Sequence, residues 1–255
     1  MQPSKISLKE KSSLPISLEN NSLVFEEYLE EVKPGIRTLE QMKPVLLDSS
    51  ISSPPECYYM YRGICREEHR EMIEGSGLRY DITVIPALML GREFNKTFGH
   101  YHPKQPETDV SYPEVYEVIQ GRAHFILQAE DSTKFFVIDA KAGEKVLVPP
   151  NFGHVTINPS KECLVLSNWV YSGFKSDYSV FEKRNGAIYH ETKGGWVENK
   201  RYPFLPKIEY ADIQGLLQLG FQENEPMYRL VNSLEKLDFL KNPGKHKYML
   251  ASLGP

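Results

Sequence analysis

Short runs of hydrophobic residues that alternate with polar ones dominate the chain from residue 56 to about residue 172. Glycine, proline and aspartate interrupt these runs at short intervals, which is typical of an all-β protein. The predicted strands are 57–63, 80–90, 100–102, 114–120, 123–128, 135–140, 145–150, 154–158 and 163–171. A series of short strands of this kind favours a closed barrel or a jelly roll over a doubly wound α/β fold.

The segment before these strands has a different pattern. The first 24 residues are rich in serine, lysine, asparagine and glutamate without a sustained period, which predicts a flexible arm. Residues 36–47 predict a short helix that Pro44 interrupts, and the sequence DSSISSPP at 48–55 predicts a loop.

Helical periodicity appears near the C-terminus. Hydrophobic residues recur there at spacings of three and four, at Met227, Leu230, Val231, Leu234 and Leu237. With Asn224 as N-cap and Pro226 in the first turn, this pattern predicts an amphipathic helix. We therefore predict an arm at 1–24, a domain at 25–200 with its barrel core at about 56–172, and a helical extension at 201–255 that packs on the barrel or on a second subunit.

Composition and charge exclude several classes of partner. The formal net charge is −4 over 255 residues, without the clustered lysine and arginine that nucleic-acid binding needs. No apolar run reaches the roughly 20 residues of a membrane helix, and no signal peptide is evident, so we expect a soluble, cytoplasmic protein that binds no membrane. The three cysteines form no CxxC pair, which predicts reduced thiols rather than disulfides.

The segment from Lys96 to Gly121 carries the most informative residues. His100 and His102 are two positions apart, so on a strand both imidazoles project from the same face while Tyr101 points away. Glu114 begins the next predicted strand, and the eleven residues between His102 and Glu114 are enough for the chain to return and bring the carboxylate to the histidine pair.

His154, in a later glycine- and proline-flanked segment, is the fourth candidate ligand. Three imidazoles and one carboxylate suit ferrous iron, zinc, manganese or nickel. Four protein ligands leave two positions of an octahedron for substrate or water, which is a catalytic arrangement. The remaining histidines lack spaced partners: we interpret His124 as structural, and His69, His190 and His246 as surface residues.

The two ligand segments match the paired motifs of the cupin family. The first contains Gly-x-His-x-His-type ligands, Glu114 and, after six further residues, Gly121; the second contains Gly143, Pro149, His154 and Asn158. More narrowly, TVIPALMLGREFNKTFGHYH and YPEVYEVIQGRAHFILQ resemble the cupin-type glucose-6-phosphate isomerases of archaea, and the likeness covers roughly residues 25–190. The sequence departs from the family pattern at Asn151, where glycine is usual, and at Ser176, where some members have histidine.

The resemblance implies a fold, a site and a partner. The fold is a cupin double-stranded β-helix, a jelly-roll barrel, here flanked by an N-terminal segment and C-terminal helices. Carried over residue by residue, the metal ligands are His100, His102, Glu114 and His154, and the sugar and phosphate contacts are Thr83, Thr97, Gly99, Tyr116 and Tyr178. Fold analogy further implies a homodimer that binds one divalent ion per subunit, Fe²⁺ before Mn²⁺, Zn²⁺ or Ni²⁺.

The KTFG sequence just before the ligands supports a phosphorylated substrate. It offers a cation, a hydroxyl group and a glycine amide that a phosphate can approach closely, so Lys96 is added to the predicted substrate contacts, with Arg92 as a further candidate. Lys96 and Arg92 could equally be solvated surface charges.

The predicted reaction interconverts the aldose and ketose forms of a hexose 6-phosphate, glucose 6-phosphate and fructose 6-phosphate. Glu114 is the candidate base for an enediol route, Tyr116 a candidate hydrogen-bond donor to a sugar oxygen, and a metal-assisted hydride shift stays open. The alternatives are a mannose-6-phosphate isomerase, an iron-dependent dioxygenase, and a non-catalytic sugar-phosphate sensor or storage cupin.

Overall fold

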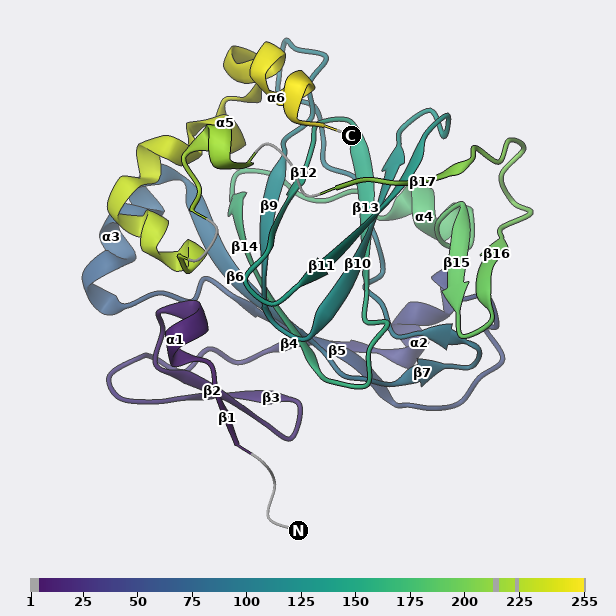
Figure 1. The fold of residues 1–255 in the computed structure, drawn as a ribbon, viewed down its shortest axis with the longest axis horizontal. Helices are drawn as coiled ribbons and strands as arrows, with labels where there is room; N and C mark the ends of the chain where they lie inside the picture. The colour runs from purple at the N-terminus through teal and green to yellow at the C-terminus, as the bar shows by residue number, and fades with distance from the viewer. Residues whose placement is uncertain (1–4, 213–215, 223–224, 255) are drawn as a thin grey trace.

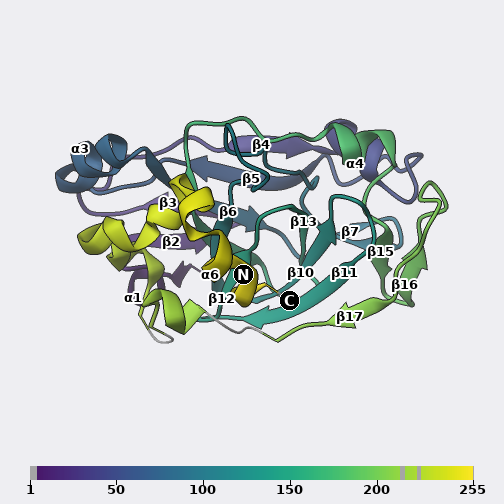
Figure 2. The ribbon, with the colours of Figure 1, turned by 90° about the horizontal axis from the view of Figure 1, so that it is seen from above.

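Two antiparallel sheets that curl around a common hydrophobic core form the centre of the molecule. The computed structural model describes residues 5–212, 216–222 and 225–254. One sheet has the strand order β12-β9-β14-β6-β5-β4 and the other β13-β10-β11-β17, where β17 is the one parallel neighbour. Figure 1 shows both sheets, and Figure 2 shows β4 and β5 on one side of the barrel with β11 and β17 on the other. The predicted all-β jelly-roll barrel is confirmed.

The strands of the barrel follow the hydrophobic pattern closely. Those of the first sheet are β4 (Gly35–Thr38), β5 (Glu56–Arg62), β6 (Leu78–Ile85), β9 (Glu114–Gln120), β12 (Lys145–Val148) and β14 (Leu164–Tyr171). Those of the second are β10 (Arg122–Ala129), β11 (Phe135–Lys141), β13 (Phe152–Ile157) and β17 (Ile208–Tyr210). A smaller sheet of β7 (Met89–Leu90), β8 (Glu93–Phe94), β15 (Tyr189–Thr192) and β16 (Gly195–Glu198) lies at one end.

The N-terminal segment differs from the predicted flexible arm. Its described part forms β1 (Ile6–Ser7), α1 (Lys9–Ser12), β2 (Ile16–Glu19) and β3 (Ser22–Phe25), and it buries Leu8, Leu14, Ile16, Leu18 and Leu23. Asn20 and Asn21 have φ angles of 50° and 64°, which is the type I′ turn of a two-residue hairpin. The polar composition of the segment hides this hairpin, so the prediction of an arm over 5–24 is wrong.

Short helices surround the barrel. They are α2 (Leu39–Met42), α3 (Glu67–Ser76), α4 (Ser179–Lys183), α5 (Asp238–Lys241), α6 (Lys247–Leu253) and the 3₁₀ helices η1 (Lys43–Val45), η2 (Leu216–Leu219), η3 (Met227–Leu237) and η4 (Pro243–His246). The predicted helix at 36–47 is instead the end of β4 followed by α2 and η1. None of the helices within the described residues has both the length and the apolar character needed to span a bilayer.

The predicted C-terminal amphipathic helix is a broken series of short helices. Ser233 has φ −155° and ψ 48°, which interrupts η3, and α5, η4 and α6 follow in turn. Serine and asparagine compete with the helix backbone for hydrogen bonds, which accounts for a break at Asn232–Ser233. The periodic residues still face the barrel, since Met227, Val231 and Leu237 are buried. Asn224, the predicted N-cap, lies outside the described residues.

Two hydrophobic clusters lie on opposite faces of the six-stranded sheet. On β9, Tyr116 and Val118 belong to the cluster inside the barrel, whereas Val115 and Ile119 belong to the outer one. The N-terminal hairpin, α3 and the C-terminal helices cover the outer face. The inner face is therefore left to form the cavity in which the candidate ligands lie.

Candidate metal centre

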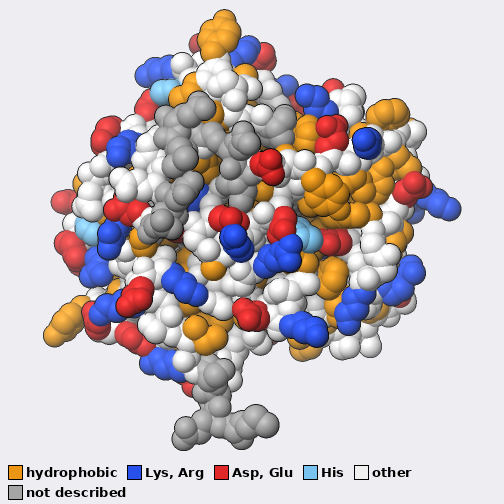
Figure 3. Space-filling view, viewed as in Figure 1, with side chains coloured by type: hydrophobic (Ala, Val, Ile, Leu, Met, Phe, Trp, Pro, Cys, Tyr) orange, Lys and Arg blue, Asp and Glu red, His pale blue; other side chains and the backbone are white. Residues whose placement is uncertain are grey.

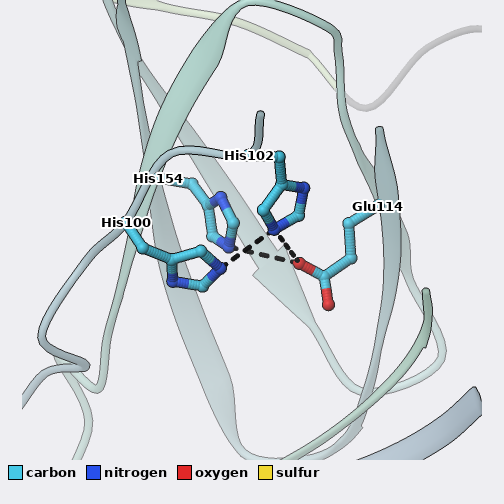
Figure 4. A group of neighbouring side chains, drawn as sticks. All are labelled: His100, His102, Glu114 and His154. Atoms are coloured by element: carbon cyan, nitrogen blue, oxygen red, sulfur yellow. Dashed lines mark hydrogen bonds and ion pairs between the residues drawn. The ribbon is translucent and has the colours of Figure 1, made fainter. Parts of the chain in front are cut away.

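Four side chains from three segments converge in the barrel (Figure 4). The backbones of His100 and His154 form an antiparallel bridge, which joins the segment 100–102 to β13. Glu114 is the first residue of β9. The alternation of side chains brings His102 beside His100, with 3.0 Å between their Nε2 atoms. One ligand atom from each of His100, His102, Glu114 and His154 lies within 4.8 Å of all the others, so the predicted set is close enough to share one cation.

The hydrogen bonds of the cluster leave room for a cation. His102 Nδ1 donates to the carbonyl of Tyr112 at 2.9 Å, which directs the lone pair of its Nε2 into the cluster. Asn168 Nδ2 donates to Glu114 Oε1 at 2.6 Å, whereas the buried Glu114 Oε2 has no hydrogen-bond partner among the described residues. That oxygen lies 3.5 Å from His102 Nε2 and 3.4 Å from His154 Nε2. A buried, unpartnered carboxylate oxygen among imidazole nitrogens fits a divalent metal.

Burial sets the charge of these groups. It lowers the pKa of His102 to about 4 and, together with the neighbouring His154 and His102, holds the pKa of His100 well below its ordinary value. Burial alone would raise the pKa of Glu114, but the neighbouring His154 and His102 outweigh it, so the net pKa is lowered. Neutral imidazoles beside an ionised carboxylate are the protonation states that metal ligation requires.

The cluster forms the floor of a cavity of about 540 Å³, a volume usual for small-molecule sites. Strand parity decides which residues line it, because positions two apart on a strand share the inner face. The lining residues from β4, β5, β6 and β14 are Arg37; Tyr58, Met60 and Arg62; Arg79, Asp81 and Thr83; and Asn168 and Val170. The cavity is thus a polar pocket with the candidate ligands at its base.

Comparison with known proteins decides the family. The family model described as Glucose-6-phosphate isomerase (GPI) matches residues 37–207, which is more than half of the chain. The chain belongs to the glucose-6-phosphate isomerase family. The predicted resemblance is thereby confirmed, and the family is one of enzymes.

Curated relatives of the family are similar over most of their length. The glucose-6-phosphate isomerase of Thermococcus litoralis is 28% identical over 173 residues, which cover 65% of this chain and 85% of the relative. That of Pyrococcus horikoshii is 27% identical, with the same shares covered. Among solved structures, the Lactobacillus farciminis oxalate decarboxylase formate complex has a TM-score of 0.36 at 18% identity and covers 49% of this chain and 32% of that chain.

The family match covers the site but not both ends of the chain. It begins at Arg37 on β4 and includes all four candidate ligands. The N-terminal hairpin and the helices from η2 to α6 lie outside it. These flanking elements cover the outer face of the six-stranded sheet.

Most of the substrate contacts carried over from the family lie in the cavity. Thr83, Thr97, Gly99, Tyr116 and Tyr178 all line it. Thr97 Oγ1 accepts a hydrogen bond from the amide of Thr156 at 2.9 Å. Gly99 has a φ of +86°, and a Cβ there would lie 2.6 Å from Val155 Cγ2, so a side chain cannot be accommodated. The backbone before the ligands therefore packs directly against β13.

Lys96 does not line the cavity, and its assignment as a substrate contact is wrong. Its ammonium group is buried, pairs with Glu93, donates to the carbonyl of Val45 at 3.0 Å and lies 3.2 Å from His190 Nδ1. Alternation along the strand turns Lys96 away from the face that Thr97 shares with the pocket. His190, predicted to lie on the surface, is 3% exposed and completes this buried cluster.

The sequence analysis missed the charged residues of the cavity wall. Arg37, Arg62, Arg79 and Lys175 all line the pocket, as does Asp81. Two of them were predictable from the alternation of side chains along a strand, because Arg79 and Asp81 lie four and two positions before Thr83 on the same strand. Arg37 was not, because the segment that holds it was predicted to be helical.

Proposed function

We propose that this chain is a metal-dependent aldose–ketose isomerase that interconverts glucose 6-phosphate and fructose 6-phosphate, a step of glycolysis and gluconeogenesis. The observation that carries the proposal is the cluster of three imidazoles and one carboxylate at the base of a cavity walled by arginine and lysine. The cluster suits the oxygens of a sugar and the basic wall suits a phosphate. Domain boundaries are part of the proposal: residues 25–200 carry the activity and 201–255 support the barrel.

His100, His102, Glu114 and His154 would hold one divalent ion per subunit, Fe²⁺ before Mn²⁺, Zn²⁺ or Ni²⁺. When bound, the ion supplies positive charge that stabilises the negative charge developing on the sugar oxygens. Asn168 donates a hydrogen bond to Glu114 Oε1, which fixes the orientation of the carboxylate. Thr83, Thr97, Gly99 and Tyr178 would position the rest of the substrate.

Glu114 and Tyr116 are the proposed catalytic residues. In an enediol route, the Glu114 carboxylate would take the proton from carbon two of the open-chain aldose and return it to carbon one, while a second proton passes from the hydroxyl on carbon two to the oxygen on carbon one. The Tyr116 hydroxyl lies 3.2 Å from His154 Nε2 and would donate to a sugar oxygen. Burial and the neighbouring Glu114 hold the pKa of Tyr116 well above its ordinary value, so the hydroxyl keeps its proton at neutral pH. In a hydride shift, Glu114 acts as a ligand without moving a proton.

A coupled assay of fructose 6-phosphate conversion tests this function. We expect protein stripped by a chelator to lose activity and to regain it with a single divalent metal, because the four clustered ligands suit one such ion. His102→Ala should bind less metal and stay inactive after reloading, while His124→Ala, outside the cavity, should behave as the parent. Activity that survives complete stripping would refute metal dependence, and turnover of mannose 6-phosphate alone would replace the proposed substrate.

A homodimer in the cytoplasm is the proposed assembly and location. Figure 3 shows hydrophobic side chains gathered on the face beside β15 and β17, and Phe204 and Tyr210 are 58% and 70% exposed. Large exposed aromatic residues are typical of interfaces. Light scattering should give twice the 29.3 kDa mass of one chain, and Phe204→Ser with Tyr210→Ser should halve it. Tyr248→Ser, at a still more exposed tyrosine of α6, is the matched control; a parent protein that is monomeric would refute the dimer.

A further inference from the structure

Arg37 has an unusual environment at the wall of the cavity. Its guanidinium carbon lies 5.3 Å from the ring centre of Phe98, 5.5 Å from that of Tyr178 and 5.9 Å from that of Tyr58. No carboxylate in the described part of the chain forms an ion pair with it. Its Nε is buried and has no hydrogen-bond partner among the described residues. Three aromatic rings thus hold a cation whose N–H donors are not used by an anion.

The other arginine that lies deep in the pocket is already neutralised. Arg79 donates from both Nε and Nη2 to the carboxylate of Asp81, at 2.8 to 3.0 Å. Arg62 and Lys175 line the same cavity and, within the described residues, form no ion pair, but both are exposed. In a chain with a net charge of −4, a pocket with three cations that lack carboxylate partners favours an anionic ligand.

Arg37 lies next to the residues expected to contact phosphate. Phe98, one of its three rings, stands between Thr97 and Gly99, and the amide of Phe98 donates to the Tyr58 hydroxyl at 3.2 Å. These contacts tie the aromatic cage to the backbone that leads into the ligand segment. Because Thr97 and Arg37 both line the cavity, a phosphate bound beside Thr97 can also contact the guanidinium.

Arg37 and the metal cluster share Tyr178 as a neighbour. The Tyr178 ring lies 5.2 Å from the His100 ring and 5.5 Å from the Arg37 guanidinium carbon. The guanidinium and the His100 ring are therefore no farther apart than the sum of these two distances. Both groups line the same cavity of about 540 Å³, so one hexose phosphate can contact the cluster with its carbonyl end and Arg37 with its phosphate.

We propose that Arg37 binds the phosphoryl group of the substrate and that the cage of Tyr58, Phe98 and Tyr178 orients it. A guanidinium group is planar and can donate two parallel N–H bonds to a phosphate monoester dianion, which a lysine cannot reproduce. Cation–π contacts with the three rings restrict the position of the guanidinium before the ligand arrives. The proposal deepens the proposed function and rests on it: Arg37 selects phosphorylated sugars over free ones.

The test compares Arg37→Met and Arg37→Lys with Arg122→Met, an exposed arginine that pairs with Asp139 outside the cavity. We expect Arg37→Met to raise KM for fructose 6-phosphate by about 30- to 100-fold, with a smaller change in kcat, because a desolvated charge pair is lost. Inhibition by inorganic phosphate should weaken by a similar factor. Arg37→Lys should recover part of the affinity, and Arg122→Met should match the parent.

Calorimetric titration with inorganic phosphate separates this proposal from the proposed function. If the parent binds phosphate, Arg37→Met does not, and neither turns over a hexose phosphate, the isomerase function is refuted while the phosphate site at Arg37 is supported. Conversely, unchanged KM and phosphate affinity in Arg37→Met, in protein that melts at the parent temperature, would overturn the assignment of Arg37 while the isomerase stands. Arg37→Lys serves the same comparison if Arg37→Met fails to fold.

Discussion

Glu114→Gln should lower kcat for fructose 6-phosphate by about 10²- to 10⁴-fold, the range typical for the loss of a proton-transferring group. Glutamine keeps the size of the side chain and can still accept the hydrogen bond from Asn168. It cannot supply the negative charge of Oε2 beside His102 and His154, nor take up a proton. The measurement is steady-state kinetics together with the metal content of the purified variant.

The metal content of the variant distinguishes the two roles of Glu114, as base and as metal ligand. Full metal occupancy with low kcat would assign it as the base, whereas loss of the metal would assign it as a ligand. Glu117→Gln is the matched control, because Glu117 lies on the same strand but faces outward, where it accepts from the amide of Met227 at 2.7 Å. We expect that control to lose stability and keep kcat; a parent-like kcat in Glu114→Gln would contradict both roles.

Lys96→Met should destabilise the protein by about 3–5 kcal/mol, because it leaves a buried carboxylate without its cation. Glu93 is completely buried, and its other oxygen accepts from the amide of Leu47 at 2.6 Å. Denaturant unfolding measures the loss. The double variant Lys96→Met with Glu93→Leu removes both charges and should recover much of the stability, as replaced buried ion pairs commonly do. Equal stability of the parent and Lys96→Met would show that the pair contributes little.

The loss caused by Lys96→Met should be smaller at pH 5.5 than at pH 8. Burial and the charge of Lys96 lower the pKa of His190, whereas Glu93, 2.8 Å from its Nδ1, raises it. Removal of Lys96 leaves Glu93 as the nearest charge, so the folded-state pKa of His190 rises. The folded variant therefore takes up a proton on His190 more readily than the folded parent, which offsets part of the loss below pH 6.5 but not at higher pH. If the loss of stability in Lys96→Met is the same at both pH values, protonated His190 does not replace Lys96 as the cation beside Glu93.

In the parent, acid should weaken the same cluster. Burial would raise the pKa of Glu93, but the charge of Lys96 and the hydrogen bond with His190 outweigh it and lower the pKa to about 2. A depressed pKa contributes stability above the unfolded value of 4.5, and this contribution is lost as the pH falls toward 2. The stability of Lys96→Met should therefore be compared with that of the parent only above pH 4.5.

Local pattern predicted the features that depend on neighbouring residues. The strands followed from alternation, and the convergence of His100 with His102 followed from their spacing of two. The burial of Lys96 could not be predicted from local pattern, because its partner His190 lies 94 residues away and a lysine gives no local sign of burial. The N-terminal hairpin was missed because its polar composition outweighed the Asn20–Asn21 turn.

The double coverage of the six-stranded sheet has a consequence for amide hydrogen exchange. On β14, Leu164 and Leu166 pack inside the barrel while Val165 and Trp169 pack outside, and Trp169 Nε1 donates to the carbonyl of Met227 at 3.0 Å. A strand buried on both faces and paired on both edges can exchange its amide protons only when the whole domain opens. Glu114 begins the neighbouring strand, so this slowest-exchanging unit supports the site on one side, while the segment of His100 and His102 lies outside it.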